Sequence, residues 1–160
     1  MLSANRDRPP RVLIVDDDVA LRRLLRAVLQ RDYVVQEAST GREALSLLRK
    51  SHPAIILLDI GMPGMDGYEN CRHIRSDQMA SESQIIMVSA RSSREEQLHA
   101  YECGADDYII KPFDPQDLLS RVRLHIELVQ ARSRVAAVRQ EIQTHNAELK
   151  ATAERRLEEI

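Results

Sequence analysis

Short apolar runs alternate with segments of helical periodicity over the first two thirds of the chain. The runs are typical of buried strands, because they are compact and rich in β-branched residues. Between them, apolar residues recur at intervals of three and four positions, as on one face of a helix. The predicted strands are 11–15, 33–38, 54–58, 84–88 and 107–110, and the predicted helices are 19–30, 40–50, one opening at 66, one from 92 or 93 to about 104, and 115–160.

This alternation predicts an α/β fold, in which helices cover both faces of a parallel five-stranded sheet. In such sheets, sites lie at the carboxyl ends of the strands, near the point where the strand order reverses. The polar residues that follow each strand are therefore the first candidates for a site.

The last predicted helix is much longer than a crossover helix requires. It opens with Asp114 as cap and Pro115 in the first turn, and it continues without Gly or Pro to Ile160. Apolar residues recur in it every seven positions, which predicts a coiled-coil seam through Leu128, Val135, Ile142 and Leu149. A parallel dimer is the simplest partner surface. A single solvated helix or a partly disordered tail is the alternative.

The pattern divides the chain into three parts. Residues 1–10 are polar and predict a disordered tail, residues 11–128 predict the globular domain, and residues 129–160 predict a helical coiled-coil extension or linker. The heptad register weakens at His145 and Thr152, and apolar residues resume on a shifted face, as after a stutter, at Ala153, Leu157 and Ile160. Because the pattern ends at Ile160 without a stop signal, we expect a fragment of a longer protein whose output domain is absent.

Composition narrows the class of function. A formal net charge of -2 gives no general attraction to nucleic acid, and no DNA-binding motif follows the globular part. The apolar runs are far shorter than the about 20 residues of a membrane span. The first residues have no secretory signal, and the two cysteines lack metal-like spacing. We expect a cytoplasmic protein that binds neither membrane nor nucleic acid.

Three carboxylates, a hydroxyl and an ammonium group follow the predicted strands. Clustered carboxylates repel one another unless a cation lies among them, and an all-oxygen ligand set suits Mg²⁺ or Mn²⁺. An ammonium and a hydroxyl can neutralise the oxygens of a phosphoryl group in transfer. Any one of these residues alone could be only a cap or a turn. Together they predict phosphoryl transfer to an aspartate, and they are Asp16, Asp17, Asp59, Ser89 and Lys111.

The segments around these residues closely resemble the response regulator receiver family. The resemblance covers residues 11–128 and implies a flavodoxin-like, doubly wound sheet with strand order 2-1-3-4-5. It also implies phosphorylation by a histidine kinase or phosphotransfer protein of a two-component system. The similar segments are VLIVDDD at 12–18, ILLD at 56–59, MPGMDG at 62–67, IMVSA at 86–90, GADDY at 104–108 and KPF at 111–113.

The resemblance implies a role for each residue of the predicted site. Asp59 is the phosphoacceptor. Asp17 and Asp59 bind Mg²⁺ directly, together with the backbone carbonyl of Gly61, and Asp16 acts largely through water.

The resemblance also implies how a signal leaves the site. Lys111 pairs with the phosphoryl group, Ser89 is the switch hydroxyl and Tyr108 is the aromatic residue that rotates on activation. The fourth helix, fifth strand and fifth helix form the output face, which often dimerises through charged pairs. Such pairs are expected at Asp107, Asp117 and Arg121, although Gln97 replaces a residue that is often basic.

Two other functions fit the residues less well. A small-molecule phosphohydrolase would need its nucleophilic aspartate after the first strand, whereas the isolated aspartate here follows the third. A docking module without phosphorylation would lack acids or the lysine, and all are present. We therefore expect a regulatory domain that catalyses only its own phosphorylation and dephosphorylation, with any effector enzyme outside this chain.

Overall fold

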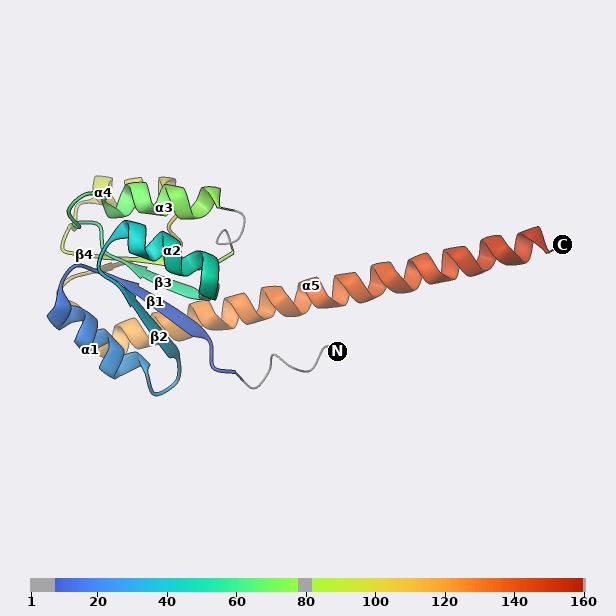
Figure 1. Ribbon diagram of the computed structural model, residues 1–160, viewed down its shortest axis with the longest axis horizontal. Coiled ribbons are helices and arrows are strands. Elements are labelled where there is room, and N and C mark those ends of the chain that lie inside the picture. Colours follow the sequence, from blue (N-terminus) through green and yellow to red (C-terminus); the bar gives the residue numbers. More distant parts are fainter. Residues whose placement is uncertain (1–7, 78–81, 160) are drawn as a thin grey trace. The chain divides into compact units, whose positions relative to one another are not determined.

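The computed structural model describes residues 8–77 and 82–159 (Figure 1). The tail predicted at residues 1–10 falls mostly on residues 1–7, which lie outside the described part. The chain forms two compact units, Met1–Ile126 and Glu127–Ile160.

Strands and helices alternate as the apolar pattern predicts. The elements are β1 (Arg11–Val15), α1 (Val19–Leu29), β2 (Val34–Ala38), α2 (Gly41–Ser51), β3 (Ile55–Leu58), α3 (Gly67–Ser76), β4 (Gln84–Ser89), α4 (Arg94–Glu102), β5 (Asp107–Ile110) and α5 (Pro115–Glu158).

The five strands form one parallel sheet in the order β2-β1-β3-β4-β5, which confirms the predicted fold class. Val15 lies opposite Leu58, so the residues that follow β1 and β3 emerge side by side. On the β5 side of the sheet, Ser89 at the end of β4 lies opposite Ile110 at the end of β5. One edge of the sheet therefore collects the residues that follow four of its strands.

Each face of the sheet carries its own hydrophobic core. Alternate strand residues point to opposite faces, so Leu13 and Ile56 pack with α2, α3 and α4, whereas Ile14 and Leu57 pack with α1 and the first turns of α5. Figure 1 shows α2, α3 and α4 on one side of the strands and α1 on the other. The two cores hold the sheet between its helices on both faces, and so they hold in place the strand ends where the site lies.

Several element boundaries differ from the predicted ones by one or two residues, and hydrogen bonds explain the start of β2 and decide between the two predicted caps of α4. The amide of Tyr33 donates to Leu29 O at 3.0 Å and so closes the end of α1, which leaves β2 to begin at Val34. Ser93 rather than Ser92 caps α4, because Ser93 and Glu96 form a capping box in which each side chain accepts from the other residue's backbone amide.

α5 changes character along its length. Within the first unit it buries Leu118, Val122, His125 and Ile126. In the second unit the predicted seam residues are exposed, by 40 % at Leu128, 52 % at Val135, 54 % at Ile142 and 56 % at Leu149. No helix among the described residues is long and apolar enough to cross a membrane.

Candidate functional site

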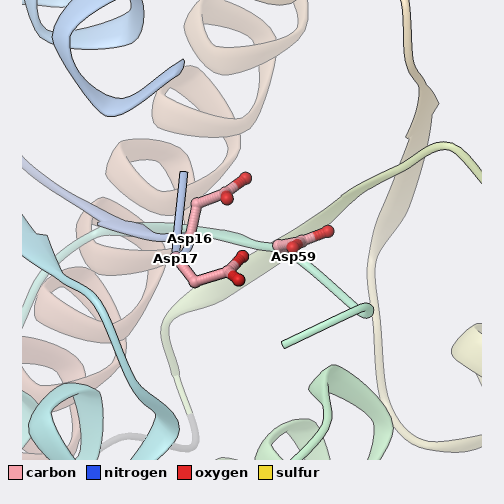
Figure 2. A group of neighbouring side chains, drawn as sticks. All are labelled: Asp16, Asp17 and Asp59. Atoms are coloured by element: carbon pink, nitrogen blue, oxygen red, sulfur yellow. The ribbon is translucent and has the colours of Figure 1, made fainter. Parts of the chain in front are cut away.

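Three carboxylates meet at the edge of the sheet where β1 and β3 end. Asp16 and Asp17 follow β1 and Asp59 follows β3, and one carboxylate oxygen of each lies within 4.8 Å of the others. Figure 2 shows the three side chains on adjoining strand ends. Asp16 and Asp59 are buried, whereas Asp17 is exposed. The structure therefore brings together the three acids that the sequence singles out.

Lys111 is a cation that contacts this cluster directly. It follows β5, and its Nζ donates to Asp16 Oδ2 at 2.9 Å and to Asp59 Oδ1 at 3.3 Å. Three carboxylates against one ammonium leave a formal excess of two negative charges. A divalent cation would balance that excess, and oxygen ligands are those that Mg²⁺ prefers.

Burial and charge shift the pKa values of the two groups that are most closely paired. Burial raises the pKa of Asp16, against the lowering effects of the Asp18 amide and of Lys111. Burial alone would lower the pKa of Lys111, but the hydrogen bond to Asp16 and the charges of Asp16 and Asp59 raise it overall. Lys111 is therefore held as an ammonium ion beside Asp59.

Gly67 at the start of α3 packs directly against the backbone of the phosphoacceptor candidate. A Cβ at this position would lie 2.4 Å from Asp59 O and 2.6 Å from Ile60 Cα. The Gly67 amide also donates to Ile60 O at 3.0 Å. Only a residue without a side chain allows α3 to approach the loop this closely.

Gly67→Ala should destabilise the fold by about 1–3 kcal/mol, because backbone atoms would have to move to admit the methyl group. Gly61→Ala is the matched control, since nothing lies within 4 Å of a Cβ there. Urea unfolding followed by circular dichroism measures both. Equal stability of the two variants would contradict the close approach.

Ser89 and Tyr108 both bind the backbone of one residue. Ser89 is buried at the end of β4, and its Oγ accepts from the Arg91 amide at 3.1 Å. Tyr108 is buried in β5, and its hydroxyl donates to Arg91 O at 2.7 Å. Burial raises the pKa of the Tyr108 hydroxyl, which keeps it a donor. The two residues are thus linked through Arg91 at the start of the β4–α4 loop.

The residues predicted for the dimer face pair with one another inside one chain. Arg121 Nη1 lies 2.9 Å from Asp107 Oδ1, and its Nε lies 3.4 Å from Asp117 Oδ2. His125, which the sequence did not single out, lies 3.1 Å from Asp107 Oδ2 through Nε2 and 3.1 Å from Gln84 Oε1 through Nδ1. Arg121 and Asp107 thus already have ionic partners in the single chain.

The seam residues of the second unit occupy one stripe of α5 at heptad spacing. Their exposure in the single chain leaves this stripe available to a partner surface.

Comparison with known proteins identifies the first unit. The response regulator receiver domain family matches residues 12–123. The transcriptional regulatory protein ResD of Bacillus subtilis is 41% identical over 114 residues, which are 71% of this chain and 46% of ResD. The chain thus spans about half the length of the curated relatives it matches.

Solved structures agree with this match. A putative response regulator from Chloroflexus aurantiacus is 36% identical with a TM-score of 0.71, covering 75% of this chain and 99% of that one. The BeF3-activated N-terminal receiver domain of Klebsiella pneumoniae RstA is 33% identical with a TM-score of 0.67, covering 72% of this chain and 97% of that one. With the parallel sheet and the acidic strand-end cluster, these matches show that the chain belongs to the response regulator receiver family of two-component signalling.

Proposed function

We propose that this chain is a phosphorylation switch that accepts a phosphoryl group on Asp59 from a histidine kinase or phosphotransfer protein. One observation carries the proposal: the Asp59 carboxylate lies against Lys111 and within 4.8 Å of the oxygens of Asp16 and Asp17. A receiver domain is a regulatory domain. This one would catalyse only its own phosphorylation and dephosphorylation, with any effector outside the chain.

The donor set fits a magnesium ion. The direct ligands would be the carboxylates of Asp17 and Asp59 and the backbone carbonyl of Gly61, and Asp16 would act largely through water. Bound Mg²⁺, or Mn²⁺ in its place, would supply positive charge to the phosphoryl oxygens.

The transfer step uses groups that the site already holds. An oxygen of Asp59 attacks phosphorus and forms an O–P bond, while the P–N bond to the histidine of the donor breaks and its electron pair returns to the imidazole nitrogen. Lys111 donates hydrogen bonds to the phosphoryl oxygens, and Ser89 donates its hydroxyl to them. The product is an acyl phosphate, whose phosphoryl group carries nearly two negative charges in place of the single charge of the carboxylate.

Those charges have a route to the output face. When the Ser89 hydroxyl turns toward the phosphoryl group, it stops accepting from the Arg91 amide. The Arg91 carbonyl, which Tyr108 holds, is then free to shift. Tyr108 rotates into the vacated space, and α4 and β5 repack.

The proposal is tested by incubating the chain with Mg²⁺ and acetyl phosphate and measuring its intact mass. We expect an adduct of about 80 Da, the mass of one phosphoryl group, that forms in the presence of Mg²⁺ and does not form when a chelator is present from the start. Absence of the adduct at saturating Mg²⁺ would contradict the proposal.

Beryllofluoride, an analogue of the phosphoryl group, should change the environment of Tyr108. In chain labelled with 3-fluorotyrosine, the ¹⁹F resonance of Tyr108 is expected to shift when the Tyr108–Arg91 hydrogen bond breaks. Tyr108→Phe assigns the resonance among the four tyrosines. Tyr33, beside β2 at the far edge of the sheet, is the internal control. A Tyr108 resonance that stays in place while the analogue binds would rule out this route.

We further propose that the active chain is a cytoplasmic homodimer, joined through the α4/β5/α5 face and the α5 seam. The exposed seam in the second unit supports this assembly. The receiver domain would end near residue 128, and residues 129–160 would form the coiled coil that leads to an output domain. Neither membrane nor nucleic acid would bind within this chain.

A further inference from the structure

The loop that joins β1 to α1 carries two of the three carboxylates of the site. The amide of Asp16 donates to Ala38 O at 3.1 Å, and Asp16 Oδ1 accepts from the Asp18 amide at 2.9 Å. Within residues 8–77 and 82–159, no hydrogen bond holds the carboxylate of Asp17. The position of Asp17 therefore depends on how firmly the backbone beside it is held.

Arg22 of α1 holds that backbone. Its Nη1 donates to the carbonyl oxygen of Asp16 at 2.7 Å. This oxygen belongs to the peptide group that joins Asp16 to Asp17, so the bond fixes the orientation of the backbone as it enters Asp17. The side chain of Arg22 is 15 % exposed, and the bond is thus largely protected from competing water.

Glu37 of β2 fixes Arg22 in turn. Its Oε1 lies 3.5 Å from Arg22 Nε, and its Oε2 lies 2.7 Å from Arg26 Nη2. Glu37 is paired in register with Ile14 of β1, two residues before the loop. Arg22 and Arg26 therefore share one carboxylate, but of these two arginines Arg22 is the one that reaches the loop.

We propose that Arg22 is a positioning residue of the metal site: it fixes the Asp16–Asp17 peptide and thereby holds Asp17 in place to ligate Mg²⁺. The inference rests on the proposed function, which requires the metal. Arg22 would act through the backbone and would touch neither the metal nor the phosphoryl group.

Charge and position predict opposite effects of removing Arg22. The Arg22 guanidinium is a positive charge bound to the loop that carries Asp16 and Asp17, and such a charge competes electrostatically with a divalent cation, so its loss alone would strengthen Mg²⁺ binding. Loss of the hydrogen bond would instead release the loop and weaken Mg²⁺ binding. A rise or a fall in Mg²⁺ affinity on removal of Arg22 therefore shows whether its charge or its hydrogen bond to the loop has the larger effect.

The test is calorimetric titration of the full chain with MgCl₂. Arg22→Met keeps the apolar stem and removes the donors, and we expect its dissociation constant for Mg²⁺ to rise on the order of tenfold, as for partners that orient a metal ligand. Arg26→Met removes the other arginine that pairs with Glu37, and its dissociation constant for Mg²⁺ should stay within about twofold of the wild-type value. Arg22→Lys keeps the charge but reaches only one of its two partners, so binding should weaken about threefold.

A second measurement needs no metal. In the metal-free protein, Arg22→Met should speed hydrogen exchange at the Asp18 amide, which bonds Asp16 Oδ1 in the same loop. Arg26→Met should leave that exchange rate unchanged.

Several outcomes would overturn the inference. One is that Arg22→Met binds Mg²⁺ as tightly as the wild type or more tightly. Another is that Arg22→Met and Arg26→Met weaken Mg²⁺ binding equally. If Arg22→Met does not fold, unchanged binding by Arg22→Lys overturns it. A wild-type chain that binds no Mg²⁺ would instead contradict the proposed function itself.

Discussion

Asp59→Asn should abolish the phosphoryl adduct, with no mass increase under conditions that modify the wild type fully. An amide nitrogen is not a nucleophile toward phosphorus, and the amide oxygen lacks the charge that drives the attack. The substitution keeps the shape of the side chain, so Asp16 and Lys111 lose no packing contact. The measurement is intact mass after incubation with Mg²⁺ and acetyl phosphate.

Asp66→Asn is the matched control for this experiment. Asp66 caps α3 by accepting from the Glu69 amide at 2.9 Å, and asparagine caps a helix equally well. This variant should be phosphorylated like the wild type. An adduct of equal size on Asp59→Asn would place the phosphoacceptor elsewhere.

Asp59→Asn should not destabilise the metal-free fold. Asp59 shares Lys111 with Asp16, so two carboxylates compete for one ammonium. Removing one of the charges relieves repulsion within the cluster. Thermal unfolding of Asp59→Asn without Mg²⁺ should therefore occur at or above the wild-type temperature. A large decrease would mean that loss of the adduct reflects unfolding.

Ile142→Asp should separate the proposed dimer. Burying one apolar side chain contributes roughly 1.5–3 kcal/mol, and a dimer would lose two such contacts and acquire two facing charges. The dimer dissociation constant should rise roughly a hundredfold or more. Light scattering of the beryllofluoride-treated chain gives the molar mass. Gln143→Asp adds the same charge next to the seam and should leave the mass unchanged.

Truncation after Gln130 distinguishes the two surfaces of the proposed dimer. If the truncated chain dimerises as well as the full chain, the α5 seam is not the interface. In that case the α4/β5/α5 face would carry the association, and the ion pairs of Arg121 with Asp107 and Asp117 would have to open or be shared between protomers.

The strand-end cluster could be predicted from sequence because it follows from topology. Parallel strands end at one edge, so residues that follow strands meet there wherever they stand in the chain. Asp16, Asp59 and Lys111 are separated by 43 to 95 positions in sequence, yet the alternation of strand and helix is enough to bring them together.

The residues that support the cluster could not be predicted in the same way. Arg22 acts through a backbone carbonyl, and no residue type or spacing marks such a bond. Gly67 stands within a recognised segment, but its contact with Asp59 O depends on how closely α3 approaches the sheet. No spacing marks His125 as part of a site, because its contacts to Asp107 and Gln84 depend on the packing of α5. Each case depends on distances that only the folded chain defines.

The link between Ser89 and Tyr108 has a consequence for how such a domain diversifies. Both side chains bind main-chain atoms of residue 91, so the link does not depend on the side chain there. The Arg91 guanidinium lies elsewhere, 5.9 Å from the centre of the Tyr68 ring and 3.9 Å from Glu96 Oε1. Substitution at residue 91 could therefore tune how tightly α4 is held, while the connection between the phosphorylation site and β5 is inherited intact.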